Sequence, residues 1–177
     1  MAPPSSALWE GRRPTLREAR PDELDTVGQV MEAAYQEYMP PNPSREWLAY
    51  REEVRDVRRR LGVSTLIVAE IDGRLVGAVT YYPDGSRETN AAWPPSWAVF
   101  RLLAVHPDVR GRGIGRLLTE ECIRRARAAR CEAVGLHTTH LMTVARAMYE
   151  RIGFVRFPEL DFFPAPQFKV MAYQLTL

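Results

Sequence analysis

The chain has 177 residues, of which 46% are hydrophobic and 26% charged, a balance that excludes a disordered protein and suits one folded domain. Twenty-four Lys and Arg against 22 Asp and Glu give a net charge of +2, too small an excess to predict a nucleic-acid partner. Two cysteines and three histidines make neither a disulfide framework nor a metal-ligand pattern, so we expect reduced thiols and no metal.

The first thirteen residues are predicted to be a flexible tail, followed by a single domain over 14–177. The tail is rich in Pro, Ser and Ala and has no apolar stretch of the kind found in signal peptides. Later apolar runs are too short to cross a bilayer. We therefore expect a cytoplasmic protein with no membrane partner, and a homodimer is left open.

The first half of the chain predicts two amphipathic helices and a hairpin. Apolar residues from Leu24 to Tyr38 recur every three or four positions, and a proline-rich stretch ends this helix. Asp72-Gly73 between two β-rich runs predicts a tight hairpin turn. In chain order the predicted elements are a strand over 15–19, helices over 21–38 and 45–61, and strands over 65–71 and 75–82.

The second half alternates strands and helices after a long polar loop over 83–95. In chain order we predict a strand over 96–105, a helix from about 114 to 130, a strand over 133–138, a helix over 142–152, and strands over 154–157 and 168–175 around a Pro-rich loop. Because helices and strands alternate throughout, the predicted class is α/β or α+β around a mixed sheet.

The most informative segment is 103–118, where a buried strand leads through an Arg/Gly-rich turn into a helix. Backbone N–H groups at a helix start attract anions, and glycines let a ligand approach the backbone closely. The arginines add cationic forks that suit phosphate oxygens. The segment therefore predicts a pyrophosphate site. It lacks both the Gly-Lys-Ser/Thr of a Walker loop and the last glycine of the dinucleotide fingerprint.

The remaining pattern, Arg110-x-x-Gly113-x-Gly115, resembles the signature of the GCN5-related N-acetyltransferase (GNAT) superfamily. Ala145-x-x-x-Tyr149-x-x-x-Gly153-Phe154 is similar to the second cofactor segment of that family, and the resemblance extends from Thr15 to the C-terminus. It implies a mixed, mostly antiparallel sheet of six to seven strands, splayed between the fourth and fifth strands and flanked by about four helices. It also implies acetyl-CoA as co-substrate and acetyl transfer to a primary amine, with no metal.

The resemblance also implies roles for individual residues. The strand end over 103–105 would pair with the pantetheine amides, the turn would hold the pyrophosphate, and Tyr149 would protonate the leaving thiolate. The implied cofactor-binding residues are Leu103, Ala104, Val105, Arg110, Gly111, Arg112, Gly113, Ile114, Gly115 and Arg116. No covalent enzyme intermediate is required, since an amine can attack the thioester directly.

Two positions depart from the family pattern. Met142 stands where many relatives have Asn, and Val99 stands where many have a Glu that acts as general base. The base is then another residue, a water chain, or no group at all if the amine arrives neutral. His137 and His140 are alternatives as bases, although a hydrogen-bonded structural role is the favoured interpretation of each.

The acceptor is the least constrained prediction. In this family it lies against the first helix–helix loop, the sheet edge and the last strand–strand loop. Aromatic and apolar residues at those places favour a small amine with an apolar body over a polycationic tail, although they could equally fill the core. These residues are Tyr35, Tyr38, Met39, Trp93, Trp97, Phe162 and Phe163. The alternatives are a protein or peptide amino-group acetyltransferase, a non-catalytic acetyl-CoA-sensing module, and an interaction domain with an incidental anion site.

Overall fold

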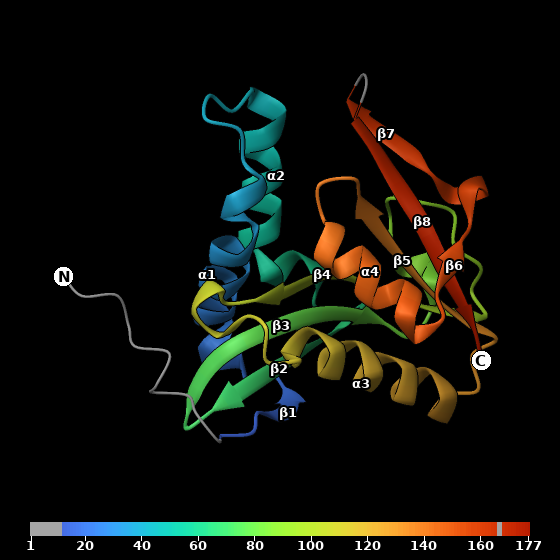
Figure 1. The fold of residues 1–177 in the computed structure, drawn as a ribbon. Coiled ribbons are helices and arrows are strands. Elements are labelled where there is room, and N and C mark those ends of the chain that lie inside the picture. Colours follow the sequence, from blue (N-terminus) through green and yellow to red (C-terminus); the bar gives the residue numbers. More distant parts are fainter. Residues whose placement is uncertain (1–11, 166–167) are drawn as a thin grey trace. The chain divides into compact units, whose positions relative to one another are not determined.

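The computed structural model describes residues 12–165 and 168–177, so most of the predicted N-terminal tail lies outside the described residues. Within them, eight strands form one mixed, mostly antiparallel sheet in the order β1-β2-β3-β4-β5-β8-β6, with β7 paired to β8 (Figure 1). The strands are β1 (Thr15–Glu18), β2 (Thr65–Ile71), β3 (Arg74–Tyr82), β4 (Trp97–Val105), β5 (Ala133–Thr139), β6 (Val155–Arg156), β7 (Phe162–Ala165) and β8 (Phe168–Thr176). The helices are α1 (Leu24–Tyr35), α2 (Arg45–Arg55), α3 (Ile114–Ala128) and α4 (Thr143–Ile152).

Contacts divide the chain into two compact units. One contains the residues up to Thr80 together with Leu102–Leu118, and the other contains Tyr81–Arg101 together with Thr119–Leu177. The strands β3 and β4 and the helix α3 contribute residues to both. The pyrophosphate turn predicted from the sequence falls in the first unit, and the predicted acid Tyr149 falls in the second.

In the first unit, α1 and α2 lie side by side (Figure 1) and pack over β2 and β3 through a buried apolar core. Gly28 allows the two helices to approach closely, because a Cβ there would lie only 2.4 Å from the carbonyl oxygen of Arg55. The predicted Asp72-Gly73 turn is confirmed, with φ angles of 50° and 77° that suit a two-residue hairpin.

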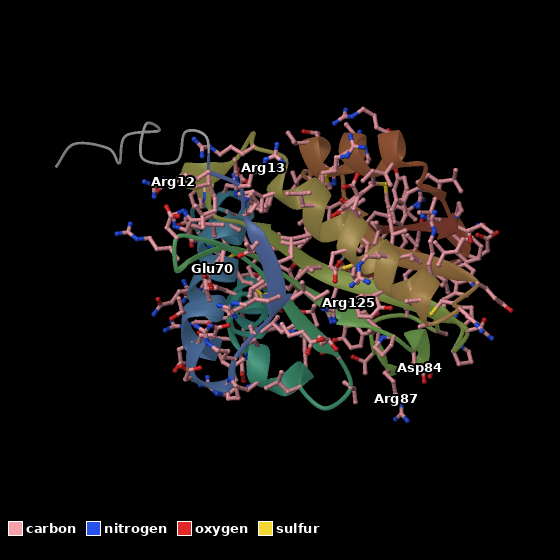
Figure 2. All side chains as sticks on the ribbon, turned by 90° about the horizontal axis from the view of Figure 1, so that it is seen from below. Arg12, Arg13, Glu70, Asp84, Arg87 and Arg125 are labelled. Carbon is pink, nitrogen blue, oxygen red and sulfur yellow. The ribbon has the colours of Figure 1, made fainter. Side chains whose placement is uncertain are left out.

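A charged cluster joins β1 to β2 and to the start of α1. Arg17 donates to Glu23 at 2.5 Å and to Glu70 at 2.5 Å, and Glu23 also accepts from the backbone N–H of Arg20 at 2.8 Å. Figure 2 labels Glu70, which lies on β2 and pairs in register with Thr15 of β1. The guanidinium of Arg17 holds the pKa of Glu23 below its usual value, so the cluster stays charged at neutral pH.

In the second unit, β4 and β5 run parallel, from the pair Trp97–Ala133 to the pair Phe100–Leu136. Pairing stops there although both strands run on, which is where the resemblance places the splay of the sheet. On the other side of β5, β8 pairs antiparallel with it along its whole length, from Ala133 to Thr139.

Two predicted elements need correction. The helix expected over 45–61 ends at Arg55, and a short 3-10 turn over Val57–Arg60 follows, since Asp56 leaves the helical region with ψ at 80°. The Pro-rich loop contains β7, which raises the strand count from the expected six or seven to eight. Pro164 is tolerated because β7 pairs with β8 only, and an edge strand does not need every N–H. None of the helices in the described ranges is long and apolar enough to span a bilayer.

Candidate active site

The strand β4 reaches the turn through a distorted segment at its end. Leu102 has a φ of 54°, a left-handed conformation that a leucine adopts only when its surroundings enforce it. Leu102 and Ala104 are buried, whereas Leu103 and Val105 are half-buried. The backbone of β4 is therefore irregular at the place where the sequence predicts the pantetheine contacts.

The turn that follows depends on two glycines. Gly111 and Gly113 have φ angles of 77° and 76°, and a Cβ on either would meet no atom within 4 Å. Glycine is needed there for the backbone conformation, while the space in front of the backbone stays open. Gly115 lies within the first turn of α3 and is not in the left-handed region, so its role is not that of the other two.

The start of α3 is held against the sheet by close packing. The carbonyl of Gly113 accepts the first helical hydrogen bond, from Leu117 at 3.0 Å. A Cβ on Gly77, in β3, would lie 3.0 Å from the carbonyl oxygen of Ala104 and 3.2 Å from both Ile114 and Leu118. Gly77 therefore lets α3 approach β3 and β4. The sequence reasoning missed this glycine, although a glycine inside a strand pattern is a recognised signal of close approach.

Arg110 does not present its guanidinium to the open side of the turn. It donates to the carbonyl of Ala34 at 2.8 Å, pairs with Glu37 at 2.8 Å, and reaches the carbonyl of Val105 at 3.4 Å. Its charge therefore ties the turn to the end of α1. Of the other two arginines, Arg112 is half-buried and Arg116 exposed.

Tyr149 lies in the second unit, on α4, and its side chain is only 4% exposed. Its ring makes edge contacts with Phe100 at 5.9 Å and with Phe154 at 5.8 Å. Its carbonyl accepts from the N–H groups of Gly153 and Phe154, which closes the helix with Gly153 at a φ of 112°. The second motif of the sequence thus forms the end of α4 and the packing around Tyr149.

Val99 and Met142, the two residues that depart from the family pattern, have apolar side chains. Val99 is buried in a cluster with Tyr82, Trp93 and Ala172. Met142 precedes α4 and makes no side-chain hydrogen bond to the helix. Neither side chain can accept a proton, so neither can act as the general base.

The aromatic residues expected at the acceptor site belong to different clusters. Those of the first unit line a shallow pocket that opens to solvent. The ring of Tyr35 makes edge contacts with Tyr38 at 6.1 Å and Tyr50 at 6.3 Å. Burial, with a hydrogen bond to Glu37, raises the pKa of Tyr38 to about 12, so it remains neutral. The other lining residues are Glu32, Gln36, Met39, Trp47, Arg51 and Val54.

In the second unit, Trp93 is a core residue. It is buried, it donates through Nε1 to Glu88 at 3.2 Å, and its ring lies over Gly135, where a Cβ would be 2.5 Å away. Trp97 lies 6.0 Å from Trp93, and Phe163 is 63% exposed on β7. For Trp93 the structure therefore favours the core interpretation.

The loop that carries Trp93 is held in place by Glu88, a residue of the loop itself. The buried carboxylate of Glu88 also accepts from Arg101 of β4 at 3.1 Å. At the start of the same loop, Asp84 caps a short turn and Arg87 points away from the protein (Figure 2).

The two histidines considered as bases differ in environment. His137, on β5, is half-buried, and its Nε2 lies 2.8 Å from the carbonyl oxygen of Leu160. His140, just after β5, is exposed and contacts the ring of Phe168 at 5.9 Å. The hydrogen-bonded interpretation is therefore confirmed for one nitrogen of His137.

Comparison with known proteins identifies the family. The model of the Acetyltransferase (GNAT) family matches residues 29–154, which is more than half of the chain. The chain belongs to this family. It is an acetyl-CoA-dependent acyltransferase, as the turn before α3 and the motif of α4 predicted.

Solved structures of GNAT proteins share the fold at low sequence identity. A ribosomal-protein-alanine N-acetyltransferase from Brucella melitensis is 21% identical with a TM-score of 0.63, over 92% of this chain and 99% of that one. A GNAT family acetyltransferase from the same organism, in complex with acetyl-CoA, is 23% identical with a TM-score of 0.59, over 93% and 91%. The ribosomal-protein-S18-alanine N-acetyltransferase from Escherichia coli is 15% identical with a TM-score of 0.65, over 93% and 94%.

The residues present fit acetyl-CoA. In the first unit, two glycines leave the backbone open in front of the N-terminus of α3, which suits an anion. No group of three or more His, Cys, Asp or Glu in the described residues could hold a metal ion.

Proposed function

We propose that the chain transfers the acetyl group of acetyl-CoA to a primary amine by direct attack in a ternary complex. The observation that carries this proposal is the turn before α3, where Gly111 and Gly113 are left-handed with open space before them. Acetyl-CoA supplies an activated acyl group, so the protein needs to bind and orient two substrates and to move protons.

The turn is proposed to hold the pyrophosphate. Backbone N–H groups of the segment from Arg110 to Gly115 are proposed to donate to phosphate oxygens, although that of Arg110 donates to the carbonyl of Pro107 in this structure. The positive end of α3 adds to the attraction. Arg112 and Arg116 supply positive charge, whereas Arg110 acts on the protein itself through Ala34 and Glu37. The strand end over 103–105 pairs with the pantetheine amides as an added strand would.

Tyr149 is proposed as the acid that protonates the thiolate of CoA. It is the residue of this chain that matches the tyrosine of the family motif. Its burial between Phe100 and Phe154 fixes the ring in one orientation, which favours proton delivery to a single position.

The acceptor is proposed to be a small amine with an apolar body, bound at the pocket between α1 and α2. The pocket walls include Tyr35, Tyr38, Trp47 and Tyr50, which suit an aromatic or aliphatic group. The second candidate acceptor is the N-terminus of a peptide, because two of the similar solved structures are named for ribosomal-protein alanine.

An amine panel tests the function and the acceptor class together. Benzylamine, phenethylamine, tyramine, spermidine, a Lys-rich peptide and a peptide that begins with Ala are each incubated with acetyl-CoA, and thiol release is followed. We expect the arylalkylamines to react fastest. Faster acetylation of the Ala peptide or of the polycations would reject the proposed acceptor. Binding of acetyl-CoA without thiol release for any amine would indicate a sensing module.

A variant of the pocket tests whether the preferred amine binds there. Trp47→Ala should raise the KM for the preferred amine about tenfold or more and leave the KM for acetyl-CoA unchanged, since it removes a wall of the pocket alone. The matched control is Val144→Ala, on the surface of α4 and 81% exposed, which should change neither constant.

A further inference from the structure

Arg110 uses all three nitrogens of its guanidinium on acceptors of the first unit. Nη2 donates to the carbonyl of Ala34 at 2.8 Å, Nη1 pairs with Glu37 at 2.8 Å, and Nε reaches the carbonyl of Val105 at 3.4 Å. A guanidinium holds its donors in one rigid plane, so it fixes these acceptors relative to one another. Arg110 therefore joins two segments that lie 76 residues apart in the sequence.

On one side, Arg110 completes the end of α1. The last carbonyl groups of a helix have no partner within it, and that of Ala34, in the final turn of α1, accepts from Arg110. The negative end of the helix dipole also favours a cation at this place. A 3-10 turn over Gln36–Tyr38 follows directly, so the anchoring of α1 determines where this turn begins.

Glu37 extends the contact to the proposed amine pocket. Its carboxylate pairs with Arg110 and accepts from the hydroxyl of Tyr38, whose side chain lines the pocket. Burial and the hydrogen bond to Glu37 raise the pKa of Tyr38, and the charge of Arg110 opposes them, as expected for three polar groups that lie together. The guanidinium thus reaches one wall of the pocket through a single carboxylate.

On the other side, Arg110 holds the start of the pyrophosphate turn. It stands directly before Gly111, and its contact with Val105 joins the end of β4 to the turn. Glycine can leave the left-handed conformation easily, so contacts beside Gly111 and Gly113 have to keep the turn in shape. Because its nitrogens have acceptors within the protein, Arg110 is suited to position the turn rather than to bind phosphate.

We propose that Arg110 is a positioning residue that couples the two substrate sites of the first unit, so that an amine in the pocket strengthens CoA binding at the turn; this rests on the proposed function. The amine orders residues 34–38 at one end of the Arg110 contacts, and the pyrophosphate orders residues 110–115 at the other. A ligand that binds to a segment already ordered loses less conformational entropy. The coupling is reciprocal, so CoA strengthens amine binding by the same factor. The residues at both ends belong to the first unit.

Calorimetric titration with CoA measures this coupling. The titration is carried out with and without the amine of the panel that is acetylated fastest. CoA carries no acetyl group, so both ligands bind without reaction. For the wild type we expect the Kd of CoA to fall about fivefold or more at a saturating amine concentration. A Kd that is unchanged or higher with the amine would overturn the proposal.

Two variants test whether Arg110 transmits the coupling. Arg110→Lys keeps the charge that attracts phosphate but replaces the planar fork with a single ammonium group. Glu37→Gln removes the carboxylate between Arg110 and Tyr38, and any general effect of this charge on CoA cancels in the ratio of the two Kd values. In each variant, and equally in the double variant, the ratio should lie within about twofold of one. A larger ratio in either single variant would contradict the assignment.

Asp25→Asn is the matched control for Glu37→Gln. Asp25 lies at the other end of α1 and accepts from Arg58 at 2.5 Å, so this variant also removes a carboxylate charge and its contact with an arginine. It should keep the wild-type ratio, and a loss of coupling equal to that of Glu37→Gln would reject the specific role of Arg110.

The variants leave the apolar core intact, because the side chains of Arg110 and Glu37 are 37% and 45% exposed. Thermal unfolding verifies that each variant is folded, and Glu37→Gln decides by itself if Arg110→Lys is not. The two proposals fail separately. Lack of CoA binding, or of acetyl transfer to any amine, rejects the function, whereas acetyl transfer with independent binding of CoA and amine rejects only the role of Arg110.

Discussion

Gly113 has the backbone conformation of a residue without a side chain, and it stands directly before α3. In Gly113→Asp the left-handed conformation costs about 1–2 kcal/mol, and a carboxylate faces the phosphates. We expect acetyl-CoA affinity to fall at least about a hundredfold in a calorimetric titration. Gly73→Asp is a strict control, because Gly73 has a φ of 77° and equally open surroundings in the β2–β3 hairpin. Equal loss of affinity in both variants would show that strain alone is responsible.

The prediction for Tyr149 also concerns a single residue, because its Phe variant lacks only the hydroxyl oxygen. Tyr149→Phe should lower kcat by about ten- to a thousandfold and leave the KM for acetyl-CoA almost unchanged, because the lost proton transfer acts in the transition state. Tyr173→Phe is the control: its hydroxyl donates to Glu150 at 3.0 Å in the same unit, and its removal should leave kcat unchanged. A normal kcat for Tyr149→Phe would reject its role as acid.

The carboxylate of Asp161 accepts several hydrogen bonds beside β8, two of them from cationic side chains. It accepts from Arg156 at 2.7 Å, from Lys169 at 2.8 Å and from the N–H of Ala172 at 2.8 Å. These contacts hold its pKa well below the ordinary 3.8 despite burial, so its contribution to stability is complete above 3.8 and is lost as the pH falls further. We expect Asp161→Asn to lower the free energy of unfolding by about 2–4 kcal/mol at pH 7 in urea titrations. The difference from the wild type should shrink in acid; a difference independent of pH would contradict this account.

At the scale of elements, the approach of α3 to β3 depends on the absence of a side chain at Gly77. In Gly77→Val the added atoms meet Ile114, Leu118 and the carbonyl of Ala104, all within 3.2 Å of a Cβ. We expect a loss of about 1–3 kcal/mol in stability and a rise in the KM for acetyl-CoA, because the start of α3 has to move. Unfolding curves and initial rates measure the two effects. A lower stability with an unchanged KM would show that α3 is not displaced.

Elements with a strong periodic or turn signal were predicted well. The strand over 65–71 has the expected limits, and the Asp72-Gly73 turn follows from local chemistry. The strand β7 was missed because its proline suggested a loop, although β7 pairs with β8, the next strand along the chain. The apolar spacing continued past Asp56, where a ψ of 80° ends α2, so the predicted helix was too long.

The candidate site was likewise predictable only in part. The turn and Tyr149 follow from motifs, whereas three contacts needed coordinates: that of the Arg110 guanidinium with Ala34, 76 residues away, the packing of α3 against Gly77, and that of His137 with the carbonyl of Leu160. Each is a contact between distant segments with no signature of its own. For Trp93 the sequence left a binding wall and a core position equally open, and its burial over Gly135 favours the core.

For the whole molecule, binding of acetyl-CoA to the folded chain should appear as added stability. At a concentration one hundred times Kd, ligand linkage contributes about 2.7 kcal/mol, which shifts Tm by about 5 °C or more for a chain of this size. Differential scanning fluorimetry with acetyl-CoA and with free CoA measures the shift. Gly113→Asp should show no shift, while Gly73→Asp should show the full one. An unchanged Tm of the wild type would argue against the proposed cofactor site.

The bond from Arg110 to the end of α1 has a consequence for how this protein can diverge. One guanidinium joins the turn proposed to bind the pyrophosphate to the carbonyl of Ala34, and its partner Glu37 is the neighbour of Tyr38 at the proposed amine pocket. Substitutions that retune the pocket at 34–38 therefore alter the turn as well, and the two sets of substitutions will show epistasis. Lineages that change amine preference are expected to acquire compensating changes at 110–116, and a mutational library confined to the pocket would miss them.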